Sequence, residues 1–492
     1  MSRMPPLEKD AENKVREELI ETRKLRYCFE CGICTGICPV VQLLPDHYNP
    51  RVLLEETFLN LDETLSEKGI WLCAWCYKCY RRCPQKTKVP EVLALVKDVA
   101  AEHDRLQSFK KALELIKNEV PLPAVCCYAC FHPERGEVEK PLIHRALERL
   151  VSEYEQVEKK NVASRFKKRE EKVAIIGSGP AGLAAARELV KIGYSVTVFE
   201  HFPAPGGMLR VGLPEHRMPK NVLDTEIRFL EDLGVEIKTN VTVGKDVTIE
   251  ELLKQGYKAV FIAVGAHKSQ KLRLEGEDLT GVVDALDFLR RVNMREKVEL
   301  GEKVAIIGGG NVAMDAAMVA LRQGAKEVRV LYRRSMEEMP ANPWELKEAE
   351  KCGAKLEFLV APKKIVGKDG RVVALECIRM QLGEADETGR KRPVPVEGSE
   401  FTIELDAVIT AIGETPDLSL LPKGLDVTEA NTVAVDPNTL ETSLLGIFAG
   451  GDAVLGPATV IEAIVAGMRA AASIDRYLRD KHIVTRKETE RN

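Results

Sequence analysis

Two kinds of hydrophobic pattern divide the chain. In residues 50–59 and 90–99, apolar residues recur every three or four positions behind a proline that suits the first turn of a helix. After residue 171, short apolar runs rich in β-branched residues alternate with helical segments, which is typical of doubly wound α/β domains. We therefore predict a helical N-terminal part, followed by an α/β region with two Rossmann-like domains.

The first dinucleotide-binding fingerprint lies at the start of the α/β region. Strand 173–176 leads into a turn with the spacing G-x-G-x-x-G, then helix 183–191, and a second strand, 195–199, ends at an acid. The glycines permit a tight turn and close approach to a pyrophosphate at the helix N-terminus, and the acid suits a ribose hydroxyl. The predicted FAD-binding residues here are Gly177, Gly179, Pro180, Ala181, Gly182 and Glu200.

The second fingerprint follows 131 residues later and differs at the end of its second strand. Strand 304–307 leads into Gly308-Gly-Gly310-Asn-Val-Ala313, and strand 327–332 ends in two arginines instead of an acid. Arginine at this position suits the 2′-phosphate of NADP, although a pair of surface arginines is the alternative. The predicted NADP(H)-binding residues are Gly308, Gly310, Asn311, Val312, Arg333 and Arg334. Two such units predict one flavin and one pyridine nucleotide, with NADP(H) as the substrate.

The chain has thirteen cysteines, and eight of them lie in the N-terminal part, between Cys28 and Cys83. They form two C-x2-C-x2-C-x3-C-P runs, the second 45 residues after the first. This spacing is that of bacterial ferredoxins, where the fourth cysteine ligates the other cluster; zinc usually takes two separated pairs. We predict two [4Fe–4S] clusters, one held by Cys28, Cys31, Cys34 and Cys83, and the other by Cys38, Cys73, Cys76 and Cys79.

The remaining cysteines leave more than one interpretation. Cys126, Cys127 and Cys130 are too few for a four-thiolate site. A carboxylate or His132 could complete a third cluster, but we favour a buried group of thiols without a ligand. Cys352 and Cys377 are isolated, and we expect both in the core.

Residues 25–105 resemble the ferredoxin subunit of heterodisulfide reductase, an α-helical two-cluster protein that passes electrons. The resemblance lies in both cysteine runs, in residues 48–51 and in residues 89–92. Residues 171–481 resemble the small subunit of NADPH-dependent glutamate synthase and the bifurcating subunit of ferredoxin:NADP oxidoreductases, through residues 205–209, 308–315, 332–341 and 450–462. The glutamate synthase subunit has a different cysteine pattern in its N-terminal cluster domain, so the resemblance points to another partner.

The second resemblance implies further cofactor-binding residues. Strands that end at Gly265 and Gly413 would mark the crossings between the FAD and NADP(H) domains. Asp452 would hold the ribityl chain, and the helix that begins near residue 458 would point its N-terminus at the flavin. The other residues expected in the flavin site are Gly206, Gly207, Gly451 and Thr459. Hydride transfer needs no acid or base from the protein, so we predict no catalytic residue.

Composition limits the class of protein and its surroundings. Lys plus Arg total 72 and Asp plus Glu total 76, a net charge of −4, which argues against nucleic acid or a membrane surface as the main partner. There is neither an apolar run of the ~18 residues that span a bilayer nor a secretory signal. We therefore expect a cytoplasmic location, which also suits cysteines used for metal binding.

These features predict an electron-transfer subunit that works between NADP(H) and partner redox subunits of a cytoplasmic complex. The complex would be heterodisulfide-reductase-like or ferredoxin-linked, and electron bifurcation at the flavin is left open. The alternative is a self-contained NADPH-dependent oxidoreductase, either of the glutamate synthase small-subunit type or sulfur-reducing. The expected organisation is a ferredoxin-like domain at 1–125, a linker at 126–170, an FAD domain at 171–300 and 413–492, and an NADP(H) domain at 301–412.

Overall fold

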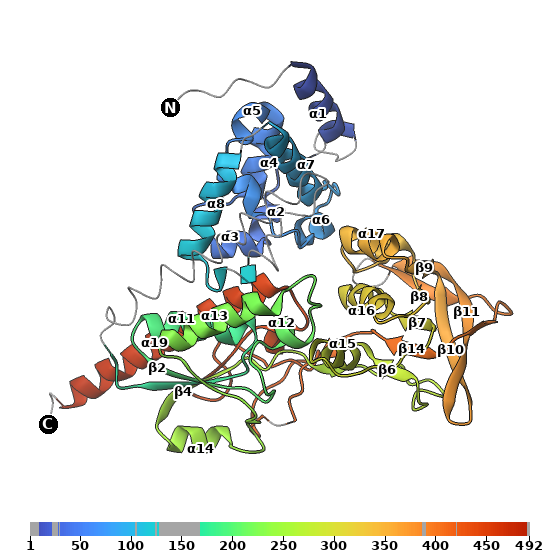
Figure 1. The fold of residues 1–492 in the computed structure, drawn as a ribbon. Helices are drawn as coiled ribbons and strands as arrows, with labels where there is room; N and C mark the ends of the chain where they lie inside the picture. The colour runs from blue at the N-terminus through green and yellow to red at the C-terminus, as the bar shows by residue number, and fades with distance from the viewer. Residues whose placement is uncertain are drawn as a thin grey trace.

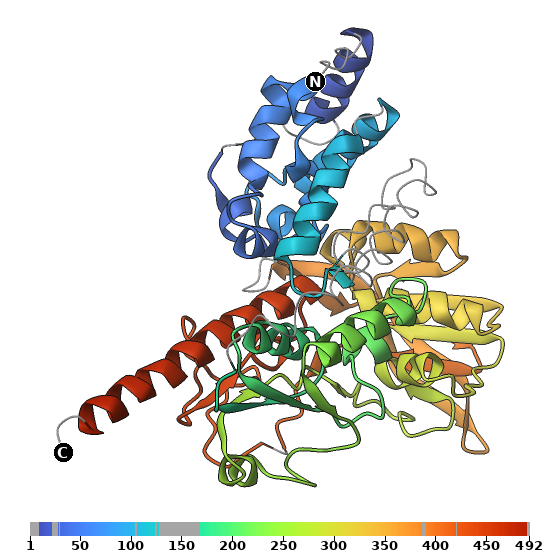
Figure 2. The ribbon, with the colours of Figure 1, turned by 60° about the vertical axis from the view of Figure 1, so that its left-hand side comes forward.

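The computed structural model describes residues 9–21, 28, 30–103, 106–123, 125–126, 168–385, 390–419 and 421–489. A helical N-terminal module lies on one side of two α/β domains, over the junction between them (Figure 1). The long helix α19 (Val460–Thr489) begins beneath this module and extends away from it, as Figure 2 shows from another side. Cys127, Cys130 and most of the expected linker lie outside the described residues.

The N-terminal module consists of short helices around the cysteine runs. Both helices predicted from periodicity are confirmed, as α4 and α7. Asn49 caps α4, because its Oδ1 accepts hydrogen bonds from the backbone N–H groups of Arg51 (3.2 Å) and Val52 (3.3 Å). The helical elements are α1 (Lys9–Glu21), α2 (Ile33–Gly36), α3 (Pro39–Leu43), α4 (Pro50–Leu59), α5 (Leu61–Thr64), η2 (Lys68–Leu72), α6 (Lys78–Arg82), α7 (Val89–Glu102) and α8 (Leu106–Glu119).

The first α/β domain is built on a parallel sheet in the order β16-β4-β1-β2-β3. Its strands are β1 (Lys172–Ile176), β2 (Ser195–Phe199), β3 (Glu236–Lys238), β4 (Tyr257–Ile262) and β16 (Ile447–Ala449). Its helices are α11 (Pro180–Lys191), α12 (Met208–Val211), α13 (Lys220–Asp232), α14 (Ile249–Lys254), α18 (Asp452–Leu455) and α19. The pairing of β16 with β4 returns the C-terminal part of the chain to this sheet.

The second α/β domain repeats the arrangement with the order β6-β14-β7-β8-β9. Its strands are β6 (Val282–Asp284), β7 (Lys303–Ile307), β8 (Glu327–Tyr332), β9 (Lys355–Phe358) and β14 (Ala407–Thr410). Its helical elements are α15 (Ala285–Asn293), α16 (Asn311–Arg322), η5 (Met336–Glu338) and α17 (Pro343–Lys351). The predicted doubly wound character of both halves is confirmed, because all neighbours in both sheets run parallel.

Two smaller sheets were not predicted from the sequence. The antiparallel strands β10 (Val360–Lys368), β11 (Arg371–Ala385), β12 (Lys391–Pro395) and β13 (Phe401–Glu404) form one, and β5 (Lys268–Ser269) with β15 (Glu414–Thr415) forms the other. The four longer strands carry many exposed and half-buried positions, so their apolar signal is weak beside that of the buried parallel strands.

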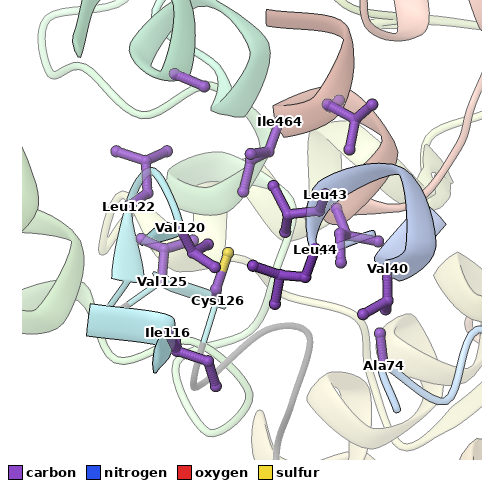
Figure 3. Packing of buried hydrophobic residues seen from close by; sticks show 14 of the residues in the cluster. Val40, Leu43, Leu44, Ala74, Ile116, Val120, Leu122, Val125, Cys126 and Ile464 are labelled. Atoms are coloured by element: carbon purple, nitrogen blue, oxygen red, sulfur yellow. The ribbon is translucent and has the colours of Figure 1, made fainter. Parts of the chain in front are cut away.

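One hydrophobic core joins the N-terminal module to the first α/β domain. Leu43 and Leu44 at the end of α3 pack near Ile464 of α19, and Cys126 lies in the same cluster (Figure 3). Each of these four side chains is at most 7% exposed. Burial of this apolar surface fixes the module on the first α/β domain, because separating the two would expose the shared core to water.

Candidate cofactor and electron-transfer site

The first dinucleotide-binding turn is tight for identifiable steric reasons. Gly177 has φ 102°, and a Cβ there would lie 2.4 Å from the carbonyl oxygen of Ala263. A Cβ on Gly182 would lie 2.0 Å from the carbonyl oxygen of Gly177, so Gly182 lets α11 pack on the turn. A Cβ on Gly179 or on Gly310 of the second turn would meet no protein atom within 4 Å. Those two positions leave the open cradle that a pyrophosphate needs.

Glu200, at the end of β2, is buried and held by several donors. Its carboxylate accepts hydrogen bonds from the backbone N–H of Ser178 (3.0 Å) and of Phe202 (2.8 Å), and it also bonds the Ser178 hydroxyl. His201 Nδ1 lies 3.0 Å from the same carboxylate. Burial by itself would raise the pKa of Glu200, but the hydrogen bonds from His201, Phe202 and Ser178 outweigh it and hold the pKa below its ordinary value.

A cavity of about 580 Å³ connects the two α/β domains with the N-terminal module. Its size and its mixed apolar and polar wall are those of a cofactor or ligand site. The predicted residues in its wall are Gly177, Gly179, Pro180, Ala181, Glu200, Gly207, Gly265, Asn311, Val312, Gly451, Asp452 and Thr459. Residues from both predicted nucleotide sites therefore face one space.

The other predicted nucleotide-binding residues do not line this cavity. Gly308 belongs to the second turn, where a Cβ would lie 2.1 Å from the carbonyl oxygen of Ala411. The N–H of Gly206 bonds Ser178 Oγ at 2.9 Å, and the carbonyl of Gly413 accepts from Gln270 N at 2.9 Å. These three glycines, like Gly182, shape the backbone around the cavity. Gly310, Arg333 and Arg334 also stand outside its wall.

Asp452 has an unsatisfied carboxylate oxygen in the cavity wall. Its Oδ1 is buried and has no hydrogen-bond partner among the described residues. Burial, together with the nearby carboxylates Glu462 and Glu414, raises the pKa of Asp452 to about 7, against the lowering effect of a hydrogen bond from the backbone N–H of Ala458. An acceptor without a donor fits a bound molecule that carries hydroxyl groups, so this residue suits the ribityl chain of FAD.

The two arginines that follow β8 have different surroundings. Arg333 is exposed. Arg334 is only 7% exposed, and its Nε donates to the carbonyl oxygen of Lys391 at 2.9 Å. Only Arg333 presents its charge to solvent beside the second dinucleotide-binding turn, whereas Arg334 ties the end of β8 to β12.

An ionic cluster around Arg217 joins the two α/β domains, and the sequence analysis missed it. Arg217 Nη1 contacts both carboxylate oxygens of Asp315 on α16 (2.9 and 2.7 Å), and Nη2 contacts Glu345 on α17 (2.8 Å). Its guanidinium also lies 5.2 Å from the centroid of the Trp344 ring. The two carboxylates raise the pKa of Arg217 against the opposing effect of burial. Asp315 falls within the glycine-rich motif 308–315, but nothing in the sequence paired it with Arg217.

The second cysteine run forms one wall of the same cavity. Ala74, Trp75 and Cys76 line it, and Trp75 is only 6% exposed. Trp75 and Tyr77 have φ of 52° and 56°, so the backbone turns sharply on both sides of Cys76. The cavity wall thus combines the predicted flavin-binding residues, part of the predicted pyridine-nucleotide turn and a predicted cluster ligand.

We name the thiols of Cys38, Cys73, Cys76 and Cys79 the proximal group, because they lie near this cavity. They interact electrostatically with one another, and Tyr48 is buried beside them. Burial raises the pKa of Cys38 to about 12 and that of Cys76 to about 11. Free thiolates are thus disfavoured here, and a bound metal would supply the positive charge that stabilises them.

The thiols of Cys28, Cys31, Cys34 and Cys83, here named the distal group, line a second, small cavity beside Arg51. Cys31 is exposed, and the other three are half-buried. Burial raises the pKa of Cys34, and the neighbouring thiols of Cys28 and Cys31 add to this effect. The structure therefore brings together the same two sets of four cysteines that the crossed assignment uses.

In the parts of the chain that the structure describes, no three His, Cys, Asp or Glu side chains converge closely enough to hold a single metal ion. Cys126 is fully buried in the apolar core (Figure 3). Its thiol donates to the carbonyl oxygen of Pro121 at 3.7 Å. Of the two isolated cysteines, Cys377 is in the core as expected. The expectation for Cys352 was wrong, because it follows the last turn of α17 and is exposed.

Sequence comparison agrees with this architecture. Residues 171–470 match the family described as pyridine nucleotide-disulphide oxidoreductase. The chain belongs to this family. Residues 24–87 match a 4Fe-4S dicluster domain, which covers both cysteine runs. The resemblances inferred from the motifs are confirmed at the level of these two families.

Curated relatives extend over both parts of the chain. The chain is 43% identical over 435 residues to the NADP(+)-dependent formate dehydrogenase subunit beta of Moorella thermoacetica, covering 82% of this chain and 60% of the relative. It is 40% identical over 436 residues to the NADPH-Fe(3+) oxidoreductase subunit beta of Geobacter sulfurreducens, covering 82% and 64%. The small chain of glutamate synthase [NADPH] from Escherichia coli is 35% identical over 429 residues, covering 81% and 88%. The chain thus spans less than two thirds of the first two relatives.

Solved structures support the fold of the flavoprotein half. FprA of Mycobacterium tuberculosis in complex with NADPH superposes with a TM-score of 0.56 at 23% identity, over 64% of this chain and 86% of that one. Thioredoxin reductase of Lactococcus lactis gives a TM-score of 0.50 at 21% identity, over 63% of this chain and 100% of that one.

No helix in the described ranges combines the length and apolar character needed to cross a membrane.

Proposed function

We propose that this chain is an electron-transfer subunit that moves electrons between NADP(H) and a partner redox subunit through one FAD and two [4Fe–4S] clusters. One observation carries the proposal. Trp75 and Cys76 of the second cysteine run form part of the wall of the cavity. Asp452 and Asn311 line the same cavity. A cluster held there would lie next to a flavin held in the cavity.

The flavin site follows from the first α/β domain. The cradle at Gly179 and the N-terminus of α11 would hold the pyrophosphate, and Glu200 would accept a hydrogen bond from a ribose hydroxyl. Asp452 would accept from the ribityl hydroxyls. The N-terminus of α19, capped by Thr459 and Glu462, would face the ring and favour negative charge on it.

The pyridine-nucleotide site follows from the second α/β domain. The open position at Gly310 and the N-terminus of α16, where Asn311 and Val312 stand, would hold the pyrophosphate. Arg333 would bind the 2′-phosphate of NADP(H), because it is exposed at the end of β8. Arg217, with Asp315 and Glu345, holds the two nucleotide domains together beside the cavity.

The proximal and distal groups would each ligate one cluster, which accounts for the crossed arrangement of their cysteines. When bound, FAD exchanges a hydride with NADP(H), and the clusters carry single electrons. The protein holds and orients these groups. Because no acid or base is required of a side chain, we assign no catalytic residue.

The distal group would face the partner, since it contains the exposed Cys31. Two of the relatives are named as beta subunits, which supports a role in a multi-subunit enzyme. We further propose the division of the chain into a ferredoxin-like domain, a split FAD domain and an inserted NADP(H) domain. The return of β16 to the sheet of β1 supports this division.

A glutamate-forming function is the second candidate. The small chain of glutamate synthase matches over 81% of this chain and 88% of its own length. Under that function, the chain would pass electrons to a glutamate-forming large subunit. Copurification would separate the two candidates, because the complex purified with the chain would then form glutamate from NADPH.

Cofactor analysis of the anaerobically purified chain tests the leading proposal. We expect about eight iron and eight sulfide per chain, together with one FAD. NADPH should bleach the flavin first and the cluster absorbance afterwards. About four iron per chain, or zinc instead of iron, would contradict the two-cluster proposal.

A further inference from the structure

Helix α6 connects the proximal group to both nucleotide domains. This short helix carries Cys79 and lies on the side of the N-terminal module that faces α17 (Figure 1). Lys78 forms an ion pair with Glu462 of α19 in the first α/β domain. Arg81 Nη2 donates to the carbonyl oxygen of Pro340 (2.6 Å) and to Asn342 Oδ1 (3.1 Å), both in the second domain.

The ion pair uses a carboxylate that also caps the helix facing the flavin site. Glu462 Oε2 accepts from the N–H (3.1 Å) and hydroxyl (2.8 Å) of Thr459, while Oε1 bonds Lys78. Glu462 is 13% exposed and Lys78 is 34% exposed. Because Thr459 lines the cavity, one side chain sets the position of the cavity wall and of the cysteine loop together.

The second contact reaches the pyridine-nucleotide turn. Asn342, which accepts from Arg81, donates its own backbone N–H to Asn311 Oδ1 at 3.0 Å. Asn311 is the first residue of α16 and lines the cavity. A continuous path of hydrogen bonds thus runs from the helix of the proximal group to the nucleotide-binding turn.

We propose that Lys78 and Arg81 are positioning residues that hold the proximal cluster against the flavin across both nucleotide domains. This inference rests on the proposed function. Electron tunnelling weakens steeply with distance, so a small displacement of α6 would slow electron transfer from flavin to cluster. Hydride transfer from NADPH to the flavin would proceed unchanged without Lys78, because that step does not involve α6.

Rapid-mixing kinetics of the full chain with NADPH separate these two steps. In Lys78→Met we expect the flavin phase at its normal rate and the cluster phase severalfold slower, because the tunnelling rate falls steeply as the distance from flavin to cluster grows. In Glu462→Gln the cluster phase should slow to a similar extent, because glutamine keeps the helix cap but loses the charge that pairs with Lys78. Lys78→Arg should restore most of the rate, and the double variant Lys78→Met with Glu462→Gln should be no slower than either single variant.

Arg81→Ala adds a readout that Lys78→Met lacks. We expect the KM for NADPH to rise severalfold in Arg81→Ala, because Asn342 loses the donor that holds it beside Asn311. Lys326→Met is the control, since it breaks an exposed lysine–glutamate ion pair, with Glu302, on the surface of the second domain. It should change neither phase.

Hydrogen exchange on the purified chain gives a measurement independent of turnover. Backbone amides of α6 should exchange faster in Lys78→Met than in the wild type, with FAD and iron contents equal in both. A normal cluster phase in Lys78→Met, Glu462→Gln and Arg81→Ala would overturn this inference alone. A wild-type chain in which NADPH reduces FAD but never the clusters would overturn the proposed function and this inference with it.

Discussion

The proximal and distal groups come from two cysteine runs of identical spacing, but the two groups have different surroundings. The proximal group includes the buried Cys73, and Cys76 lies in the wall of the large cavity. The distal group includes the exposed Cys31. The proximal group is therefore the inner one and the distal group the outer one, although both come from the same motif. This arrangement suits a path of electrons from a cofactor inside the protein to a partner outside it.

The backbone after the fourth cysteine of each run also differs. Cys38 is the N-cap of α3, with Pro39 at the first helical position. Cys83 instead follows α6, and its sulfur accepts a hydrogen bond from the N–H of Thr87 at 3.3 Å. The next helix after the second run, α7, begins at Val89. The repeat thus specifies the chemistry of each site but not the structure around it.

Serine substitutions of one inner and one outer cysteine would break this comparison with the largest effect. In Cys76→Ser, NADPH should still bleach the flavin, but electron delivery to either cluster should fall more than about 100-fold, beyond the range typical of outer-shell changes. In Cys31→Ser, the proximal cluster should still be reduced, and only delivery to the partner should fail. Rapid-mixing absorbance and low-temperature electron paramagnetic resonance would follow each cluster.

Equal defects in the two cysteine variants would mean that the groups do not act in series. Full activity of Cys76→Ser with the physiological partner would place the proximal group off the pathway. Cys352→Ser is the matched control, because this exposed cysteine lies outside both groups.

The inner position matters only if the cavity holds FAD, and Asp452→Ala tests that condition. Loss of a charge-assisted hydrogen bond of about 1.5–3 kcal/mol should weaken FAD binding about 10- to 150-fold. The flavin-to-protein ratio after gel filtration and a titration of the flavin-free chain would measure it. Unchanged flavin retention would show that Asp452 does not bind the cofactor.

The contrast between inner and outer side chains extends to the two arginines at the end of β8. Arg333→Ala should raise the KM for NADPH about tenfold while leaving that for NADH nearly unchanged, because an exposed contact to the 2′-phosphate is lost. Arg334→Ala should instead lower the free energy of unfolding by about 1–3 kcal/mol, because the half-buried hydrogen bond from its guanidinium to the carbonyl of Lys391 is lost. The reverse pattern would exchange their roles.

The smallest expected effect is on the pH dependence of FAD binding. The pKa of Asp452 is about 7 without FAD, and hydroxyl donors of the ribityl chain would lower it by favouring the carboxylate. Affinity should therefore be greatest above pH 7 and fall severalfold as the pH drops from 8 to 6, since protonation then competes with binding. Asp452→Asn should bind FAD more weakly and lose this dependence, whereas an unchanged profile would assign it to another group.

The sequence was a good guide wherever function requires contiguous residues. Both strand–turn–helix units were placed correctly, because their buried strands and glycine turns have strong local patterns. The antiparallel sheet of β10–β13 and the Arg217 cluster were not predicted. Arg217 is 98 residues from Asp315 and 128 from Glu345 in the sequence, so no local pattern links them.

By itself, the sequence determined the two repeated cysteine runs, the two nucleotide-binding turns and the residues able to ligate each group, because each depends on residue type at short, fixed spacings. The tertiary structure decided which group of cysteines is inner and which is outer. That choice depends on the packing of α3 on α19 and on the contacts of Lys78 with Glu462 and of Arg81 with Asn342. These contacts join segments hundreds of residues apart, and only burial of a shared core brings them together.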